Sequence, residues 1–198
     1  MDESPTLRYT RTAVFLHWFI GLGILAMFAL GWYMTGLPKE GPKLTSFDMF
    51  NLGIYTWQSA EPISVRNLYF NLHKSIGITL LALIILRIVW RLTHEPPALL
   101  PSLKVWEKKL ANLGHRLLYL LMIAVPLSGL IMTLNGKYGV KWFGIPFLPG
   151  SENKPLREAF VEVHEIVGII LLVVIVVHVL GALKHHFIDK DGSLKRML

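Results

Sequence analysis

The chain has 198 residues, of which 53% are hydrophobic and 17% are charged, and its mean hydropathy is +0.50. This composition is typical of a small polytopic membrane protein and excludes an ordinary soluble domain. The chain has no cysteine, which excludes disulfides, iron–sulfur clusters held by thiolates and haem attached through paired cysteines. The formal net charge of +7 is spread over the connecting segments, so we expect no nucleic-acid partner.

Four stretches are long and apolar enough to cross a bilayer as helices. In chain order they are residues 13–36, 74–92, 115–134 and 164–183, and each can span the hydrocarbon core. The expected fold class is therefore all-α, an integral membrane four-helix bundle. We expect residues 1–198 to form a single domain that lies among membrane lipids.

The distribution of lysine and arginine predicts the orientation. The helix flanks on the side of the two termini hold eleven of these residues, and the flanks on the other side hold eight. Because lysine and arginine are enriched on the cytoplasmic side of a membrane, both termini are predicted to be cytoplasmic. The connections 37–72 and 135–163 are then expected to face outward.

The fourth stretch carries a histidine near each end. His164 and His178 are fourteen residues apart, so both side chains leave the same face of a helix, about 21 Å apart along its axis. That separation is most of the roughly 30 Å thickness of the hydrocarbon core. One helix therefore offers an imidazole nitrogen near each membrane surface.

Depth in the membrane predicts which histidines share an iron ion. His17 enters the first stretch from the cytoplasmic side, near the depth of His178, and His73 opens the second stretch from the outer side, near the depth of His164. We therefore expect His17 to pair with His178 and His73 to pair with His164. Two such pairs indicate two non-covalent, b-type haems. Histidines at both axial positions favour electron transfer over oxygen binding.

A glycine follows three of these histidines by four residues. Gly21, Gly77 and Gly168 are these glycines, whereas His178 is followed by Ala182. Residues at this spacing share a helix face, and a glycine leaves room for a porphyrin against the backbone. Small residues also let membrane helices pack closely without any cofactor. Because the pattern repeats beside three histidines, we favour contact with the cofactor.

Arg87 lies inside the second stretch, fourteen residues after His73 and on the same helix face. An arginine within a membrane span usually has an anionic partner, and the propionates of an inner haem would serve. The alternative is that Arg87 reaches the cytoplasmic headgroups. His115 opens the third stretch at the depth of the inner pair, but Tyr119 would obstruct a ring there. We therefore expect His115 to support the site or to lie at the interface.

The outer connections suggest two further features. Lys137 and Lys141 would lie near the outer pair, where positive charge could steer superoxide or an acidic redox protein. Anchoring of the topology is the alternative role for these lysines. Residues 37–72 are rich in aromatic side chains. The sequence leaves three roles open for this segment: a lid over the outer haem, a docking surface, or a segment that rests in the lipid headgroups.

Several spaced motifs resemble the bacterial cytochrome b561 family over nearly the whole chain. They are RYTRTAVFLHW, LHKSIGITLLALIILRIVWRL, LANLGHRLLYLLMIAVPLSGLIM, HEIVG with the downstream His178, and ALKHHFIDKDGSLKRM. The resemblance implies a four-helix protein of the bacterial inner membrane with two b-type haems. It also implies haem ligation by His17, His73, His164 and His178, and electron exchange with quinone.

Two other classes remain open. The chain could be the haem-bearing membrane-anchor subunit of a dehydrogenase or hydrogenase, since related b-type subunits share the four-helix core. It could also be a metal-ion transporter that uses the same histidines without haem, although the repeated histidine–glycine spacing argues against this. No residue pattern indicates a nucleophile or a general base, so any enzymatic role is that of an electron-transfer oxidoreductase.

Overall fold

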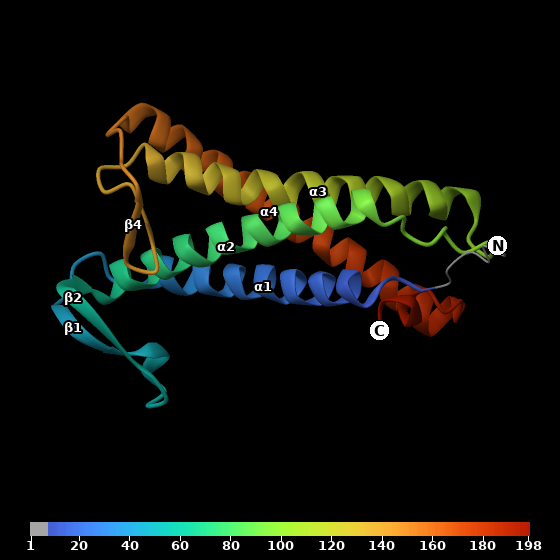
Figure 1. Ribbon diagram of the computed structural model, residues 1–198, viewed down its shortest axis with the longest axis horizontal. Coiled ribbons are helices and arrows are strands. Elements are labelled where there is room, and N and C mark those ends of the chain that lie inside the picture. The colour runs from blue at the N-terminus through green and yellow to red at the C-terminus, as the bar shows by residue number, and fades with distance from the viewer. Residues whose placement is uncertain (1–7) are drawn as a thin grey trace.

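The structure, a computed structural model, describes residues 8–198. Four long helices lie along one another in an elongated bundle (Figure 1): α1 (Arg11–Gly36), α2 (Val65–Thr93), α3 (Val105–Leu134) and α4 (Lys154–Lys184). Each helix is long and apolar enough to cross a membrane. The prediction of an all-α fold with four membrane-spanning helices is confirmed.

Helices α2, α3 and α4 begin well before the apolar stretches expected at residues 74, 115 and 164. Polar side chains mark two of these starts. The Ser64 hydroxyl accepts a hydrogen bond from the Asn67 amide at 3.3 Å, and the Asn153 side chain accepts one from the Leu156 amide at 3.2 Å. Such caps satisfy amide groups that a first helical turn leaves unpaired.

His73, His115 and His164 consequently lie inside their helices. The sequence predicts that each of these histidines lies at the start of its helix. That prediction is wrong, because each helix begins earlier in the chain. Hydropathy marks only the part of a helix that suits the hydrocarbon core, whereas the caps mark where the helix begins. The extra turns of these helices extend beyond the strongly apolar windows.

The helices pack as two neighbouring pairs, α1 with α2 and α3 with α4, and α2 also contacts α3. A buried apolar cluster joins all four helices; its members are Leu16, Ile20, Ile24, Ile84, Leu121 and Leu171. Much of the remaining apolar surface is exposed, as at Leu22, Leu120 and Ile169. In a chain of this composition such faces are expected to contact lipid.

The connection between α1 and α2 and the connection between α3 and α4 contain two short β-hairpins that the sequence does not predict. Strands β1 (Lys43–Asp48) and β2 (Thr56–Ser64) pair antiparallel on either side of a 3-10 turn, η1 (Met49–Asn51). Strands β3 (Val140–Trp142) and β4 (Ile145–Leu148) form the second hairpin. Both are small local additions to the helical bundle.

The β3–β4 hairpin lies against the N-terminal half of α2. The amide of Phe143 donates a hydrogen bond to the Ser75 hydroxyl at 2.9 Å, and the Trp142 indole donates to the Thr79 hydroxyl at 3.2 Å. Ser75 is two residues beyond His73. The hairpin therefore covers α2 beside one of the histidines that the sequence analysis singles out.

The C-terminal turns close the opposite end of the bundle. They comprise a π-helix, η2 (His185–Asp189), and a 3-10 helix, η3 (Leu194–Met197). The indole of Trp18 donates a hydrogen bond to the Met197 carbonyl at 2.7 Å. The start of α1 and the end of the chain therefore lie at the same end of the bundle, as an even number of spans requires.

Candidate cofactor sites

The structure brings the four predicted histidines together as two pairs. His17 of α1 faces His178 of α4 with ring centroids 6.2 Å apart and ring planes at 81°. His73 of α2 faces His164 of α4 with ring centroids 6.4 Å apart and ring planes at 82°. These are the partners that membrane depth predicts, and α4 supplies one ring to each pair.

The spacing of both pairs suits one metal ion between two imidazoles. A metal–imidazole bond is about 2 Å long, so two rings on opposite sides of an ion have centroids roughly 6 Å apart. Edge-to-face ring packing can also produce such a spacing. The ring of His73 provides a second observation: its Nδ1 atom is buried and has no hydrogen-bond partner among the described residues. Buried polar atoms are normally paired, and an imidazole nitrogen without a hydrogen bond is chemically suited to bind a metal ion.

His164 is oriented by α3. Its Nδ1 atom lies 2.9 Å from the carbonyl oxygen of Val125 and 3.1 Å from the hydroxyl of Ser128. The Ser128 hydroxyl also donates to the Val125 carbonyl at 2.8 Å. Because a carbonyl only accepts hydrogen bonds, Nδ1 must carry the proton, which leaves Nε2 free to bind a metal. Ligating histidines are commonly held in this way through their second nitrogen.

Two glycines that the sequence spacing does not predict lie against His73 and His164. A Cβ atom on Gly129 of α3 would lie 3.0 Å from Cε1 and 3.2 Å from Nδ1 of His164. A Cβ atom on Gly31 of α1 would lie 3.7 Å from Cε1 of His73. These glycines are on neighbouring helices, so only the packing of the bundle identifies them.

The three predicted glycines have different surroundings. A Cβ atom on Gly21 would meet nothing within 4 Å. One on Gly77 would meet the end of Met27 at 3.7 Å, and one on Gly168 would meet the ring of Phe28 at 3.9 Å. Gly21 thus borders open space one turn from His17, whereas Gly77 and Gly168 make ordinary contacts with α1.

A third histidine, His115, lies beside the pair formed by His17 and His178. The ring centroid of His115 in α3 is 5.6 Å from that of His178, with an angle of 63° between the rings. Histidines from three helices therefore meet at the inner site. Tyr119, one turn along α3, contacts Arg87: its hydroxyl accepts a hydrogen bond from Arg87 Nε at 3.4 Å.

Arg87 borders a positively charged cavity at the end of the bundle where α1 begins. The cavity has a volume of about 120 Å³ and is lined in part by Arg8, Arg87, Arg91, His94, Glu95 and Tyr119. The guanidinium group of Arg91 lies 5.4 Å from the centre of the Tyr119 ring. Three arginines and a single carboxylate among these side chains suit an anionic group, such as a carboxylate or phosphate.

A further group of possible metal ligands lies in the C-terminal turns. Glu107, His185 and Asp189 offer ligand atoms within 4.8 Å of one another. The ammonium group of Lys184 already lies 3.0 Å from Glu107 and 2.5 Å from Asp189. A protein cation thus balances these carboxylates, and we assign the group to an ion-pair network that joins α3 to the end of α4.

Four membrane-spanning helices with a histidine pair toward each end define the class of small multi-pass membrane cytochromes. Comparison with known families agrees with this class: the family described as prokaryotic cytochrome b561 matches residues 8–198. The chain belongs to this family, and the predicted resemblance is confirmed. The protein is therefore a bacterial multi-pass membrane cytochrome of the b type that takes part in electron transfer.

Individual relatives cover most of the chain. Cytochrome b561 homolog 2 of Escherichia coli K12 is 35% identical over 196 residues, which are 96% of this chain and 91% of the relative. Cytochrome b561 homolog 1 of the same organism is 29% identical over an alignment of 199 positions, gaps included, which covers 96% of this chain and 97% of the relative. A protein of Yersinia pestis named probable superoxide oxidase CybB is 33% identical over 155 residues, 74% of this chain and 87% of the relative.

Proposed function

We propose that the protein is a dihaem cytochrome that carries electrons between the two membrane surfaces and exchanges them with quinone. His17 and His178 would hold the inner haem, and His73 and His164 the outer haem. The observation that carries this proposal is the repeated geometry on α4, where two rings face histidines of other helices at 6.2 Å and 6.4 Å. The quinone part rests on the family resemblance of the chain.

Bound haem would supply reversible one-electron chemistry at each histidine pair. His17 with His178, and His73 with His164, would each hold one haem through two imidazoles, a ligand set that favours electron transfer over oxygen binding. Leu171 lies between His164 and His178 on α4 and is 2% exposed, and Ile20 and Ile84 in the same cluster are each 1% exposed. This apolar layer excludes water between the two sites.

The haem content of the purified protein tests this proposal. We expect two b-type haems per chain and a reduced-minus-oxidised spectrum that develops on addition of quinol. One haem per chain would overturn the dihaem assignment. A protein with no haem would instead favour the transport of metal ions by the same histidines. Reduction by dithionite but not by quinol would leave the haems in place and overturn only the quinone part.

We also propose that both termini of the chain lie in the cytoplasm. The excess of lysine and arginine in the flanks on that side supports this orientation. Arg87 and the inner cavity would then lie toward the cytoplasm, and the two hairpins would lie toward the outer surface. We also propose that Gly21, Gly77 and Gly168 border the haems, with the open space beside Gly21 as the clearest support.

Arg87 is proposed to interact with the propionates of the inner haem. We expect Arg87→Gln to lower the midpoint potential of that haem by roughly tens of millivolts, because loss of a nearby positive charge disfavours the reduced form. A redox titration followed optically measures this shift. Arg116→Gln, on the exposed surface of α3, is the charge-matched control. If the midpoint potential of the inner haem were the same in the Arg87→Gln and Arg116→Gln variants, the proposed contact of Arg87 with the propionates would be contradicted.

Lys137 and Lys141 are proposed to attract an anionic electron donor to the outer surface. Both residues are exposed, and the Lys141 carbonyl accepts a hydrogen bond at 3.3 Å from Ser75, which is two residues beyond His73. The name of the Yersinia pestis relative, probable superoxide oxidase, suggests superoxide as one such donor. Positive charge near an entry site accelerates encounter with anions.

Replacement of both lysines by glutamine should therefore slow reduction of the outer haem by superoxide. We expect a decrease of roughly three- to ten-fold at low salt and a weaker dependence on ionic strength. Stopped-flow absorbance of the haem band measures the rate. The double variant Lys190→Gln, Lys195→Gln removes equal charge from the opposite end and should leave the rate unchanged. Equal rates for the wild type and the Lys137, Lys141 double variant would contradict steering by these residues.

A further inference from the structure

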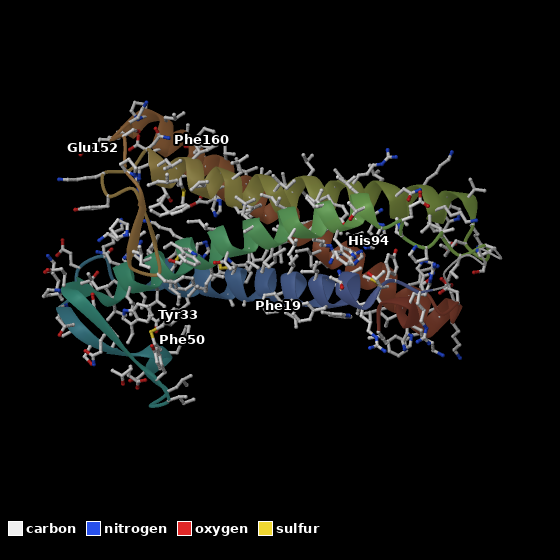
Figure 2. The ribbon with its side chains drawn as sticks, viewed as in Figure 1. Phe19, Tyr33, Phe50, His94, Glu152 and Phe160 are labelled. Atoms are coloured by element: carbon white, nitrogen blue, oxygen red, sulfur yellow. The ribbon has the colours of Figure 1, made fainter. Side chains whose placement is uncertain are left out.

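The β1–β2 hairpin projects obliquely from the end of the bundle where α1 ends. It slants away from α1, and its turn lies nearer the middle of the long axis of the bundle than its base does (Figure 1). Phe50 in the turn lies next to Tyr33 of α1 (Figure 2), with ring centroids 5.9 Å apart. Because Tyr33 precedes the end of α1 at Gly36, the turn lies at the depth of the last helical turn of α1.

Polarity changes along the hairpin. Charged residues cluster at its base, where Lys39, Glu40, Lys43 and Glu61 are exposed. Residues 49–58 contain no charged side chain. Several apolar and aromatic side chains of the turn are exposed: Phe50 by 47%, Leu52 by 62%, Ile54 by 82% and Tyr55 by 59%. The turn, which lies nearer the middle of the bundle along its long axis, is thus the apolar end of the hairpin.

Three backbone amides of the turn are hydrogen-bonded within the protein. The Phe50 amide donates a hydrogen bond to the Tyr69 hydroxyl at 2.7 Å, and the Met49 amide donates to the Tyr55 carbonyl at 2.9 Å. The Gly53 amide donates to the Asp48 carboxylate, at 3.0 Å and 2.9 Å from its two oxygens. Paired amides lower the cost of placing irregular backbone in contact with lipid. The single carboxylate near the turn is also engaged by these contacts.

The turn lies next to exposed aromatic residues of α1, since Phe50 contacts Tyr33. Trp32 and Tyr33 are 65% and 43% exposed near the outer end of this helix, where aromatic side chains are typical of the membrane interface. We propose that residues Phe50–Tyr55 insert into the interface of the outer leaflet and anchor the hairpin in lipid. Of the three roles that the sequence leaves open for residues 37–72, this one fits the contacts of the hairpin. The inference does not depend on haem binding.

The absence of native cysteine allows a direct test with single spin labels. A nitroxide would be attached at Ile54→Cys and, as a control, at Tyr138→Cys in the other outer connection, since both native side chains are 82% exposed. The two labelled proteins would be placed in vesicles of phosphatidylethanolamine and phosphatidylglycerol. Collision rates with oxygen, which partitions into lipid, and with a water-soluble nickel chelate would be measured by electron paramagnetic resonance (EPR).

We expect the label at residue 54 to collide more with oxygen than with the nickel chelate, and the label at residue 138 to show the reverse. Equal preference for the nickel chelate at both positions would place the turn in water and overturn the proposal. Shielding of residue 54 from both reagents would also overturn it, because the turn would then be covered by another protein surface, such as a second copy of the chain. Circular dichroism spectra equal to that of the unlabelled protein would show that the labelled proteins are folded.

Discussion

Replacement of His178 by alanine should remove the inner haem and leave the outer haem in place. The ring of His178 faces the other two histidines of this site, with ring centroids 6.2 Å from that of His17 and 5.6 Å from that of His115. Its loss leaves no imidazole on α4 at this depth. His73→Ala should have the opposite outcome, because His164 then loses its partner at 6.4 Å. The two variants should therefore each keep a different haem.

Haem content and EPR spectra of the purified variants measure this prediction. Each single variant should contain about half the haem of the wild type and should keep one of two low-spin signals. His94→Ala is a suitable control, since the His94 ring stacks on Trp90 at 3.8 Å in the inner flank. Retention of both haems in His178→Ala would rule out the proposed inner ligand. Loss of both haems from a monodisperse protein would show that the two sites are not independent.

Replacement of Gly129 by valine should selectively remove the outer haem. The first atom of the new side chain would lie 3.0 Å from the His164 ring, and the valine branches would add to this overlap. The ring cannot simply move aside, because the Val125 carbonyl and Ser128 hydroxyl hold its Nδ1 atom at 2.9 Å and 3.1 Å. Misalignment of a metal ligand typically weakens binding strongly, by about 10- to 100-fold for a lost orienting contact.

Gly114→Val provides the matched control on the same helix. A Cβ atom on Gly114 would meet nothing within 4 Å, whereas the intrinsic cost of valine in a helix is similar at both positions. We expect the Gly114 variant to keep two haems and the Gly129 variant to keep only the inner one, as measured by haem content and redox titration. A Gly129 variant with both haems and an unchanged outer potential would contradict the predicted overlap.

The sequence predicts the four helices and the meeting of the histidine pairs because both depend on simple repeats. The apolar windows have the length of a bilayer, and the fixed rise of a helix gives His164 and His178 their separate depths. The helix starts are harder to predict, since Ser64 and Asn153 act as caps in polar segments that hydropathy does not assign to helices.

Contacts between helices cannot be obtained from such repeats. The hydrogen bond between His164 and Val125 and the close approach of Gly129 join α3 to α4, so they depend on how the two helices are rotated against each other. The contact of His115 with His178 has the same origin. The β1–β2 turn is likewise held by the distant aromatic residues Tyr33 and Tyr69, and the local sequence gives no sign of these partners.

The presence of one histidine of each pair on α4 has a consequence for how the protein can change in evolution. Every added residue in a helix rotates the following side chains by about 100°. An insertion or deletion of one residue between His164 and His178 would therefore turn one ring away from its partner while the other stayed in place. The lipid-facing positions of this segment, such as Ile169 and Val173, can exchange among apolar types, but the length of the segment is constrained. If the two pairs hold haem as proposed, that constant length also fixes the electron-tunnelling distance between the two haems, whatever small movements the other three helices make.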